Sequence, residues 1–146
     1  MKWGLKNISL VLGVLIVLAV VGVSGCTSSG NSTSTQPSKI NVTNVTVKSS
    51  GYGFYDIDAA IVPNKDIDYL EMATVWYDSS GAVIETSPLV WNVNNAKAGQ
   101  VYKADGSDSL YDKGTPAKVD VYIFDSAFSG GDTSNAIYHT TVNMKS

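Results

Sequence analysis

This 146-residue chain contains no arginine, a single cysteine and a single histidine, and each shortage excludes a class of protein. One cysteine cannot form a disulfide within the chain, and a zinc site built from several cysteines and histidines is excluded as well. The ten basic residues are all lysines and face 13 acidic ones, so the net charge is −3. An acidic chain without arginine is a poor candidate for nucleic-acid binding. We therefore expect no nucleic-acid partner and a fold that packing alone must stabilise.

Charge is also missing from residues 8–23, a 16-residue run that is almost entirely apolar and follows Lys2 and Lys6. A secretory signal has an apolar region of about 7–15 residues after a basic start, whereas a membrane-spanning helix needs about 20. The length of this run is nearer to that of a signal. We expect residues 1–25 to form an apolar N-terminal helix that acts as a signal peptide, with retention as a membrane anchor as the alternative.

The four residues Val23-Ser24-Gly25-Cys26 follow, and they place the only cysteine of the chain after two small residues. Small residues let a peptidase grip extended backbone at the membrane surface, and a thiolate is the nucleophile that accepts a lipid. The tetrapeptide resembles the lipobox of prokaryotic lipoproteins, in which the chain is cut before the cysteine and the thiol is lipidated. The resemblance implies lipidation of Cys26 and a lipid-anchored location on the extracytoplasmic side of the cell membrane. A lone cysteine that ends an ordinary anchor is the alternative.

Residues 26–39 have the composition of a flexible tether. Between positions 27 and 38, eight of twelve residues are serine or threonine, and none is charged or large and apolar. Such a segment cannot bury enough surface to offset its ordering entropy, and its reach is roughly 20 Å. Asn-x-Ser/Thr sequons begin at Asn31, Asn41 and Asn44, which are candidate glycosylation sites if the host glycosylates exported proteins.

Residues 40–146 form the predicted domain, and their pattern is that of strands. Strand-forming Val, Ile, Thr, Tyr and Trp dominate, and no window keeps apolar residues at helical spacing over three turns. The expected strands are 40–49, 53–62, 68–78, 82–86, 88–93, 100–104, 117–125 and 136–145, with polar loops at 105–114 and 128–135. About seven short strands with frequent turn signals predict an all-β fold, an antiparallel immunoglobulin-like β-sandwich.

The same residues predict a bulge, a central strand and a buried tryptophan. The apolar positions change parity near Thr43-Asn44, which indicates a bulge or a sheet switch in the first strand. Both faces of strand 68–78 are largely apolar, so this strand should be central. Trp76 or Trp91 should supply part of the packing between the sheets, because one aromatic side chain buries roughly 150–250 Å².

A hairpin motif joins two of the expected strands. Trp76-Tyr77-Asp78 ends one strand, Gly81 follows in the turn, and aliphatic residues resume the next strand. Asp78 should cap the turn with its side chain, and Gly81 should take a positive φ. The pattern resembles FxLYD-type domains, which are extracytoplasmic β-sandwich domains of prokaryotic, notably archaeal, lipoproteins. It departs from that pattern at two positions: Thr74 stands where Phe is expected, and Trp76 stands where Leu is expected. The resemblance implies a fold and little about function, because that family has no shared catalytic residues.

Catalytic and metal-binding patterns are weak in this sequence. His139 lies on the last expected strand, and no Gly-x-Ser-x-Gly nucleophile motif accompanies it. Asp105, Asp108 and Asp112 share one loop and are weak calcium candidates, but the Asp-x-Asp-x-Asp-Gly pattern of a twelve-residue calcium loop is absent. Solvated acids and a surface or edge-strand histidine are the simpler interpretation. We expect no enzyme, no cofactor and no metal.

Aromatic residues are the remaining candidates for a binding surface. Tyr52, Phe54 and Tyr55 cluster beside two glycines, and Trp91 follows soon after Pro88. If these aromatic side chains are exposed, they could stack on sugars or contact a partner protein. If they are buried, they belong to the core or to cross-strand pairs. The sequence predicts a membrane-anchored extracytoplasmic lipoprotein, a non-enzymatic interaction module for an envelope protein or a glycan. The alternatives are a calcium-binding, glycan-binding or sensory lipoprotein and an accessory subunit of a membrane complex.

Overall fold

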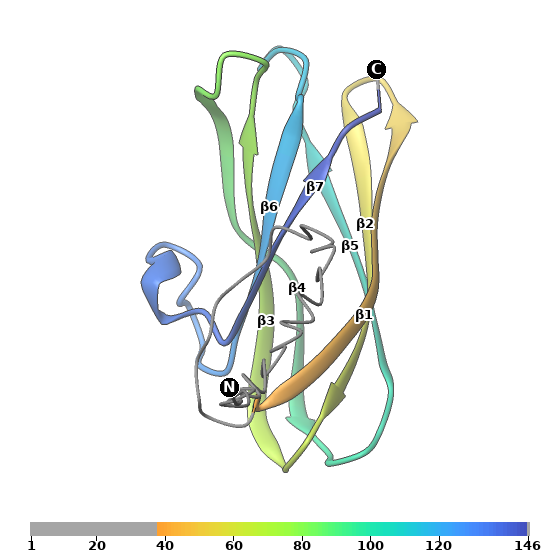
Figure 1. Cartoon of the computed structure of the whole chain (residues 1–146), viewed down its shortest axis with the longest axis vertical. Coiled ribbons are helices and arrows are strands. Elements are labelled where there is room, and N and C mark those ends of the chain that lie inside the picture. The colour runs from red at the N-terminus through yellow and green to blue at the C-terminus, as the bar shows by residue number, and fades with distance from the viewer. Residues whose placement is uncertain (1–37, 146) are drawn as a thin grey trace, which may run out of the picture. The chain divides into compact units, whose positions relative to one another are not determined.

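A computed structural model describes residues 38–145, which form two antiparallel sheets (Figure 1). The first sheet contains, in order, β1 (Ile40–Gly51), β2 (Phe54–Pro63) and β5 (Tyr102–Ser109). The second contains, in order, β4 (Val83–Ala96), β3 (Ile67–Tyr77), β6 (Lys118–Phe124) and β7 (Tyr138–Asn143). A short 3₁₀ helix, η1 (Thr133–Asn135), precedes β7. The predicted all-β sandwich of about seven strands is confirmed.

Several predicted features lie outside the described residues. These are the signal helix, the lipidation site Cys26, nearly all of the tether, and the first sequon at Asn31. Within residues 38–145, no helix is long and apolar enough to cross a membrane.

The strand order resembles an immunoglobulin sandwich with one difference from the constant-type domain. In that domain the fourth strand pairs in the sheet of the first, second and fifth strands. Here β4 pairs with β3 instead, which gives sheets of three and four strands. The edge strands are therefore β1 and β5 in the first sheet, and β4 and β7 in the second.

The core lies between the sheets because apolar residues alternate along their inner faces. On β2, Ile57, Ala59 and Ile61 are buried, while the residues between them are more exposed. The central strand β3 lies between β4 and β6 and is buried on both faces, as its sequence predicts. Trp76 of β3 is fully buried, and its ring lies 5.0 Å from that of Tyr55 on the other sheet.

Two of the predicted assignments are wrong, and the other strand boundaries shift by one to three residues. Segments 82–86 and 88–93 form the single strand β4, whose pairing with β3 is irregular around Pro88. Proline lacks an N–H group but is tolerated in an edge strand, so it interrupts the pairing without ending β4. Residues 105–109 belong to β5 and not to a loop. Gly106 and Asp108 occupy inward positions that usually hold large apolar residues, so the alternation of this strand is hidden in the sequence.

The predicted bulge and hairpin turn have clear local causes. β1 bulges at Asn44, which adopts a φ of +55°. In the β3–β4 turn, Asp78 Oδ1 accepts hydrogen bonds from the backbone N of Ser80 at 2.8 Å and from its hydroxyl at 2.6 Å, and Gly81 has a φ of +87°. The hydroxyl of Ser80, followed by backbone N–H donors, holds the pKa of Asp78 below its ordinary value.

A buried carboxylate holds the β6–β7 loop. Glu71 of β3 is fully buried and accepts hydrogen bonds from the backbone N atoms of Phe128, Ser129 and Gly130 at 2.9, 2.5 and 3.1 Å. A buried charge needs such partners to be tolerated. Gly130 packs so closely on β4 that a Cβ there would overlap the carbonyl oxygen of Pro88. The loop is thus pinned to β3 and β4 together.

The strands run up and down, so the turns gather at two ends of the sandwich (Figure 1). At one end, the residue before β1 meets the β2–β3 turn, where Asn64 N donates to Lys39 O at 2.9 Å. At the opposite end, the β1–β2 hairpin meets the β5–β6 loop, where Leu110 N donates to Gly53 O at 2.7 Å. We call these the entry end and the distal end.

Candidate functional site

Asp108, one of the three candidate calcium ligands, faces inward and joins the two sheets. Its carboxylate accepts hydrogen bonds from Thr74 Oγ1 at 2.7 Å, Trp76 Nε1 at 2.6 Å and Ser87 Oγ at 2.7 Å. These three donors belong to β3 and β4, and Thr74 and Trp76 are fully buried. Both oxygens of Asp108 are therefore engaged by protein donors, and its evident role is structural.

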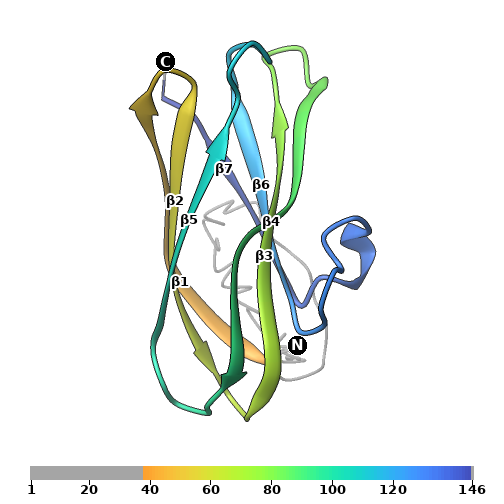
Figure 2. The same ribbon diagram turned by 180° about the vertical axis from the view of Figure 1, so that it is seen from behind.

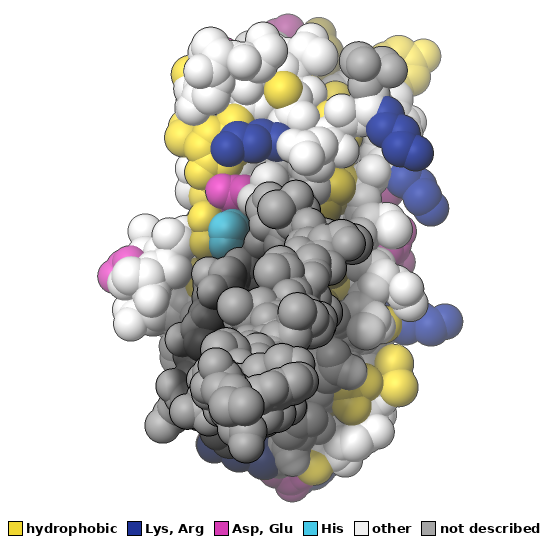
Figure 3. Space-filling model, viewed as in Figure 1, with side chains coloured by type: hydrophobic (Ala, Val, Ile, Leu, Met, Phe, Trp, Pro, Cys, Tyr) yellow, Lys and Arg dark blue, Asp and Glu magenta, His cyan; other side chains and the backbone are white. Residues whose placement is uncertain are grey.

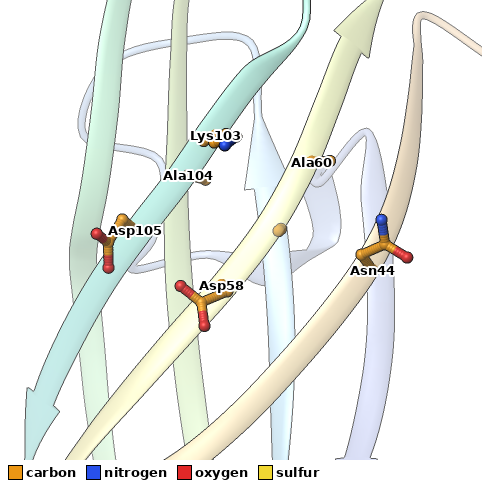
Figure 4. Close-up of a pocket in the computed structure, with 7 residues that line it drawn as sticks. Asn44, Asp58, Ala60, Lys103, Ala104 and Asp105 are labelled. Carbon is orange, nitrogen blue, oxygen red and sulfur yellow. The ribbon is translucent and has the colours of Figure 1, made fainter.

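The other two acids lie apart from this network. Asp105 is exposed on β5, directly opposite Asp58 of β2 in the strand register. Both line a shallow depression of about 240 Å³ on the first sheet, together with Asn44 and Lys103 (Figure 4). Asp112 is exposed in the β5–β6 loop. In the part of the chain that the structure describes, no three acidic, histidine or cysteine side chains are grouped to hold a metal ion.

His139 lies on the edge strand β7, and its side chain reaches the surface (Figure 3). Its ring stacks on that of Tyr122 with centroids 4.5 Å apart, and its Nε2 lies 3.5 Å from Asp120 Oδ1. Burial acts to raise the pKa of Asp120, but hydrogen bonds from Thr141 and Tyr77 and the charge of His139 outweigh it and lower that pKa. Burial, helped by Asp120, raises the pKa of Tyr77 to about 12. These groups form a mutually satisfied network on the outer face of the second sheet.

Three aromatic side chains are exposed together at the distal end. Tyr52 in the β1–β2 hairpin is 91% exposed, Phe54 at the start of β2 is 48% exposed, and Tyr111 in the β5–β6 loop is 66% exposed. Tyr55, by contrast, packs against Trp76 and belongs to the core. We call Tyr52, Phe54 and Tyr111 the aromatic end.

The backbone holds the aromatic end in a defined position. A Cβ on Gly53 would lie 3.0 Å from Tyr111 N, and Gly53 has a φ of +78°, so glycine is favoured where hairpin and loop meet. Tyr52 has a φ of +54°, which is uncommon for a residue with a side chain and persists only where the surroundings enforce it. In the same loop as Tyr111, Lys113 Nζ lies 3.1 Å from Glu85 Oε2 of β4. The aromatic side chains therefore extend from an anchored backbone.

A groove opens between the edge strands β1 and β7. It has a volume of about 510 Å³ and is lined by five residues of β1 and four residues at the end of the chain. Its apolar lining residues, Val45, Val47, Val142 and Met144, pack on the core but are only half-buried. At the other side of the sandwich, β4 and β5 contact each other more extensively (Figure 2). We call the opening between β1 and β7 the edge groove.

Sequence reasoning pointed to Tyr52 and Phe54, and it missed Tyr111 and the edge groove. Tyr111 joins the aromatic end only because β2 pairs with β5, which places Phe54 opposite Ser109. The valines of the edge groove have the pattern of ordinary core positions, and only the separation of the two edge strands exposes them. Neither feature has a local signal in the sequence.

Comparisons with known proteins show only distant likeness. No family model matches this chain, and no curated protein matches it. Among solved structures, it is similar to a DUF1425 family member from Shewanella sp. pv-4, with a TM-score of 0.43 and 20% identity, covering 60% of this chain and 78% of that chain. It is also similar to a GH3 β-glucosidase from Bifidobacterium adolescentis, with a TM-score of 0.43 and 11% identity, covering 72% of this chain and 17% of that one. These likenesses assign no activity.

Proposed function

We propose that this protein is a membrane-anchored extracytoplasmic lipoprotein whose β-sandwich is a non-enzymatic interaction module. The observation that carries the proposal is the place of the aromatic end, opposite the end at which Lys39 leads into β1. A tether between the entry end and a lipidated Cys26 leaves the distal end free to face away from the membrane. β4 alone has 14 residues and spans about 45 Å, so the aromatic end can stand well clear of the bilayer.

Exposed aromatic side chains on an anchored backbone have the chemistry of a contact surface. Single exposed apolar residues are ordinary, but a cluster at one place on a small domain marks an interaction site. Aromatic anchors contribute much of the energy of many interfaces, and a preset conformation reduces the entropy lost on binding. The partner class is an envelope protein or a glycan, since both are recognised by aromatic faces.

Site-specific photo-cross-linking in native membranes tests this surface. Benzoylphenylalanine replaces Tyr52 or Tyr111 in turn and, as a control, Val101, which is 59% exposed near the entry end. We expect the two aromatic positions to cross-link to one partner and Val101 to give no such product. Equal cross-linking from all three positions, or none from the aromatic positions, would contradict the proposal.

The lipid anchor is tested separately by the intact mass of the membrane-purified protein. We expect a mature chain that begins at a lipidated Cys26, and the substitution Cys26→Ser should abolish both lipid and cleavage. A mature chain that retains Met1, or begins at an unmodified residue, would reject the anchor. The same masses report glycans on the sequons, of which Asn41 and Asn44 are exposed on β1.

Ligand binding is the second candidate function, and the aromatic end favours a glycan over calcium. The ring faces of Tyr52 and Tyr111 can stack on sugars, whereas Asp108 is occupied and Asp105 is exposed on the outer side of β5. Thermal unfolding separates the two, because a ligand that binds only the folded state raises Tm. A rise in Tm with calcium would support the metal form, and a rise with an envelope polysaccharide would support the glycan form. A protein that stays bound at a fixed ratio when the chain is purified without cross-linking would instead make the chain a subunit of a membrane complex.

A further inference from the structure

Phe128, in the β6–β7 loop, is an apolar residue that the stability of the fold does not explain. Its side chain is 91% exposed, so it adds nothing to the core. Its φ is +58°, a left-handed conformation that glycine or asparagine adopts with less strain. A single exposed apolar residue is ordinary, but one at a strained backbone position points to a role outside the fold.

The loop holds Phe128 in place through its backbone. The N atoms of Phe128 and of the two residues after it donate to the buried carboxylate of Glu71. Gly130, two positions further along, packs directly against Pro88 of β4. The side chain of Phe128 therefore projects from a fixed backbone, and little conformational entropy is lost when it makes a contact.

Phe128 lies toward the entry end of the sandwich. β3 begins at that end and pairs antiparallel with β6, so β6 ends there. Asp125, the first residue after β6, forms an ion pair with Lys39, the residue before β1, with Oδ2 and Nζ 2.5 Å apart. The β6–β7 loop projects from the side of the sandwich, in its lower half in Figure 1, where β1 begins.

A second exposed apolar side chain lies at the entry end. Val101, between β4 and β5, is 59% exposed. The N atom of Gly99 donates to the carbonyl oxygen of Pro63 at 2.8 Å, which places the β4–β5 turn beside the β2–β3 turn. The β4–β5 turn and the β6–β7 loop lie on either side of the start of β3 (Figure 1). A partner that touches both Val101 and Phe128 must therefore be a broad surface.

The proposed lipid anchor puts one broad surface within reach of this end. The segment from Cys26 to Lys39 has a reach of roughly 20 Å, so the entry end stays near the bilayer. A short tether gives an effective concentration in the millimolar range, so even a weak contact forms. Full burial of a Phe side chain shifts such an equilibrium by roughly 10- to 100-fold.

Charges at the entry end balance, so the contact must be apolar. Its charged residues include Lys39, Lys65 and Lys97 on one side and Asp66, Asp68 and Asp125 on the other. Lys97 pairs with Asp66, as Lys39 does with Asp125. Asp132, in the same loop as Phe128, is exposed and adds a negative charge. Among the described residues, this end therefore has no excess of lysine that would attract anionic headgroups.

We propose that the entry end rests on the lipid surface, with Phe128 inserted at the level of the headgroups and Val101 as a second apolar contact. Aromatic rings suit this interfacial region. The sandwich then meets the membrane at a preferred tilt, and the aromatic end faces away from it. This inference rests on the proposed function, because the lipidated Cys26 keeps the domain at the membrane.

Photo-cross-linking of the full-length protein in native membranes tests the contact. Benzoylphenylalanine replaces Phe128 or, as a control, Tyr52, which is also 91% exposed and has a φ of +54° but lies at the distal end. We expect position 128 to form lipid adducts about fivefold more often than position 52, at low and at high salt alike. Equal lipid yields, adducts lost at high salt, or a protein as the main product at position 128 would overturn the proposal.

A spin label at Val101→Cys measures how deep the entry end lies. The protein is reconstituted in nanodiscs of zwitterionic lipid, and collisions of the label with oxygen, which concentrates in the bilayer, are compared with collisions with a water-soluble nickel chelate. Phe128→Asn should lower the oxygen-to-nickel ratio about threefold, because it removes the inserted ring. Tyr52→Asn should leave the ratio unchanged. Both variants should keep the urea midpoint, since asparagine tolerates a positive φ.

The anchor and the lipid contact fail separately. Cys26 is the only cysteine of the chain, so a lipidated protein with Val101→Cys takes up one label. Two labels per chain would reject the anchor and, with it, this inference. One label per chain, with the same oxygen-to-nickel ratio in Phe128→Asn as without it, would overturn the lipid contact and leave the anchored interaction module standing.

Discussion

The substitution Asp108→Ala should be among the most destabilising exchanges of an acidic residue in this domain. Although Asp108 lies on a polar strand that reads as a loop, its carboxylate receives hydrogen bonds from Thr74 and Trp76 of the opposite sheet. Both donors are fully buried, so both lose their carboxylate acceptor inside the protein when it is removed. Ser87, the third donor, is only half-buried and can turn toward solvent.

The magnitude follows from the two buried donors. A buried donor left without its partner costs about 1–3 kcal/mol. The indole N–H of Trp76 keeps a second acceptor, Thr74 Oγ1 at 3.1 Å, which reduces its share. We therefore expect the free energy of unfolding to fall by about 2–4 kcal/mol, a large fraction of the roughly 5–15 kcal/mol typical of a domain.

Urea unfolding followed by tryptophan fluorescence measures this loss. The control is Asp105→Ala, three positions earlier on the same strand but exposed, for which we expect a change within about 0.5 kcal/mol. Asp108→Asn should be intermediate, because its amide keeps one acceptor oxygen and the hydroxyls of Thr74 and Ser87 can accept from its NH₂ group. Equal midpoints for Asp108→Ala and Asp105→Ala would refute the inter-sheet link.

Three further substitutions, with Gly131→Ala as a control, test the loop and the outer sheet face. Gly130→Ala should destabilise the fold by about 1–3 kcal/mol through overpacking against the β4 carbonyl, whereas Gly131→Ala, where a Cβ meets open space, should be nearly neutral in the same urea experiment. Glu71→Gln should speed amide hydrogen exchange at the three N–H groups of the β6–β7 loop, because a neutral amide accepts fewer and weaker hydrogen bonds; unchanged exchange would exclude the carboxylate clamp. The pKa of Tyr77 is about 12 in the folded state, whereas an unperturbed tyrosine has a pKa of about 10, so stabilisation present below pH 10 is lost between about pH 10 and 12. Tyr77→Phe should reduce this loss of stability above pH 10. It should also remove one of the tyrosine ionisations that occur at the highest pH in an ultraviolet titration, and an unchanged titration would contradict the raised pKa.

Local patterns predicted most of the secondary structure. The alternation of Val119, Val121 and Ile123 identifies β6, and the apolar faces of 68–78 identify the central strand. The bulge at Asn44 was visible as a change of parity in the apolar positions. These signals act over a few residues, so they survive without knowledge of the rest of the chain.

Residues with two possible roles could not be assigned in the same way. Asp108 and Asp105 look alike in the sequence, yet one joins the sheets and the other is exposed. Tyr55 and Phe54 are neighbours, yet Tyr55 packs in the core and Phe54 is exposed. Strand parity decides each pair. On β2 the buried Ile57 and Ile61 reveal it, whereas on β5 the small or polar inward residues Ala104, Gly106 and Asp108 hide it.

From the sequence alone it follows that this chain forms strands, where most of their turns lie, and that no disulfide within the chain holds them together. Tertiary structure alone decided which of those strands close on each other. Contact between β4 and β5 covers one side of the core, while β1 and β7 stand apart and leave Val47 and Val142 half-buried in a groove. Pairing of β2 with β5 likewise brings Tyr111 to Gly53, the residue that follows Tyr52. The physical reason is range: alternation and turn chemistry act between near neighbours, whereas these surfaces join residues that are far apart in the chain.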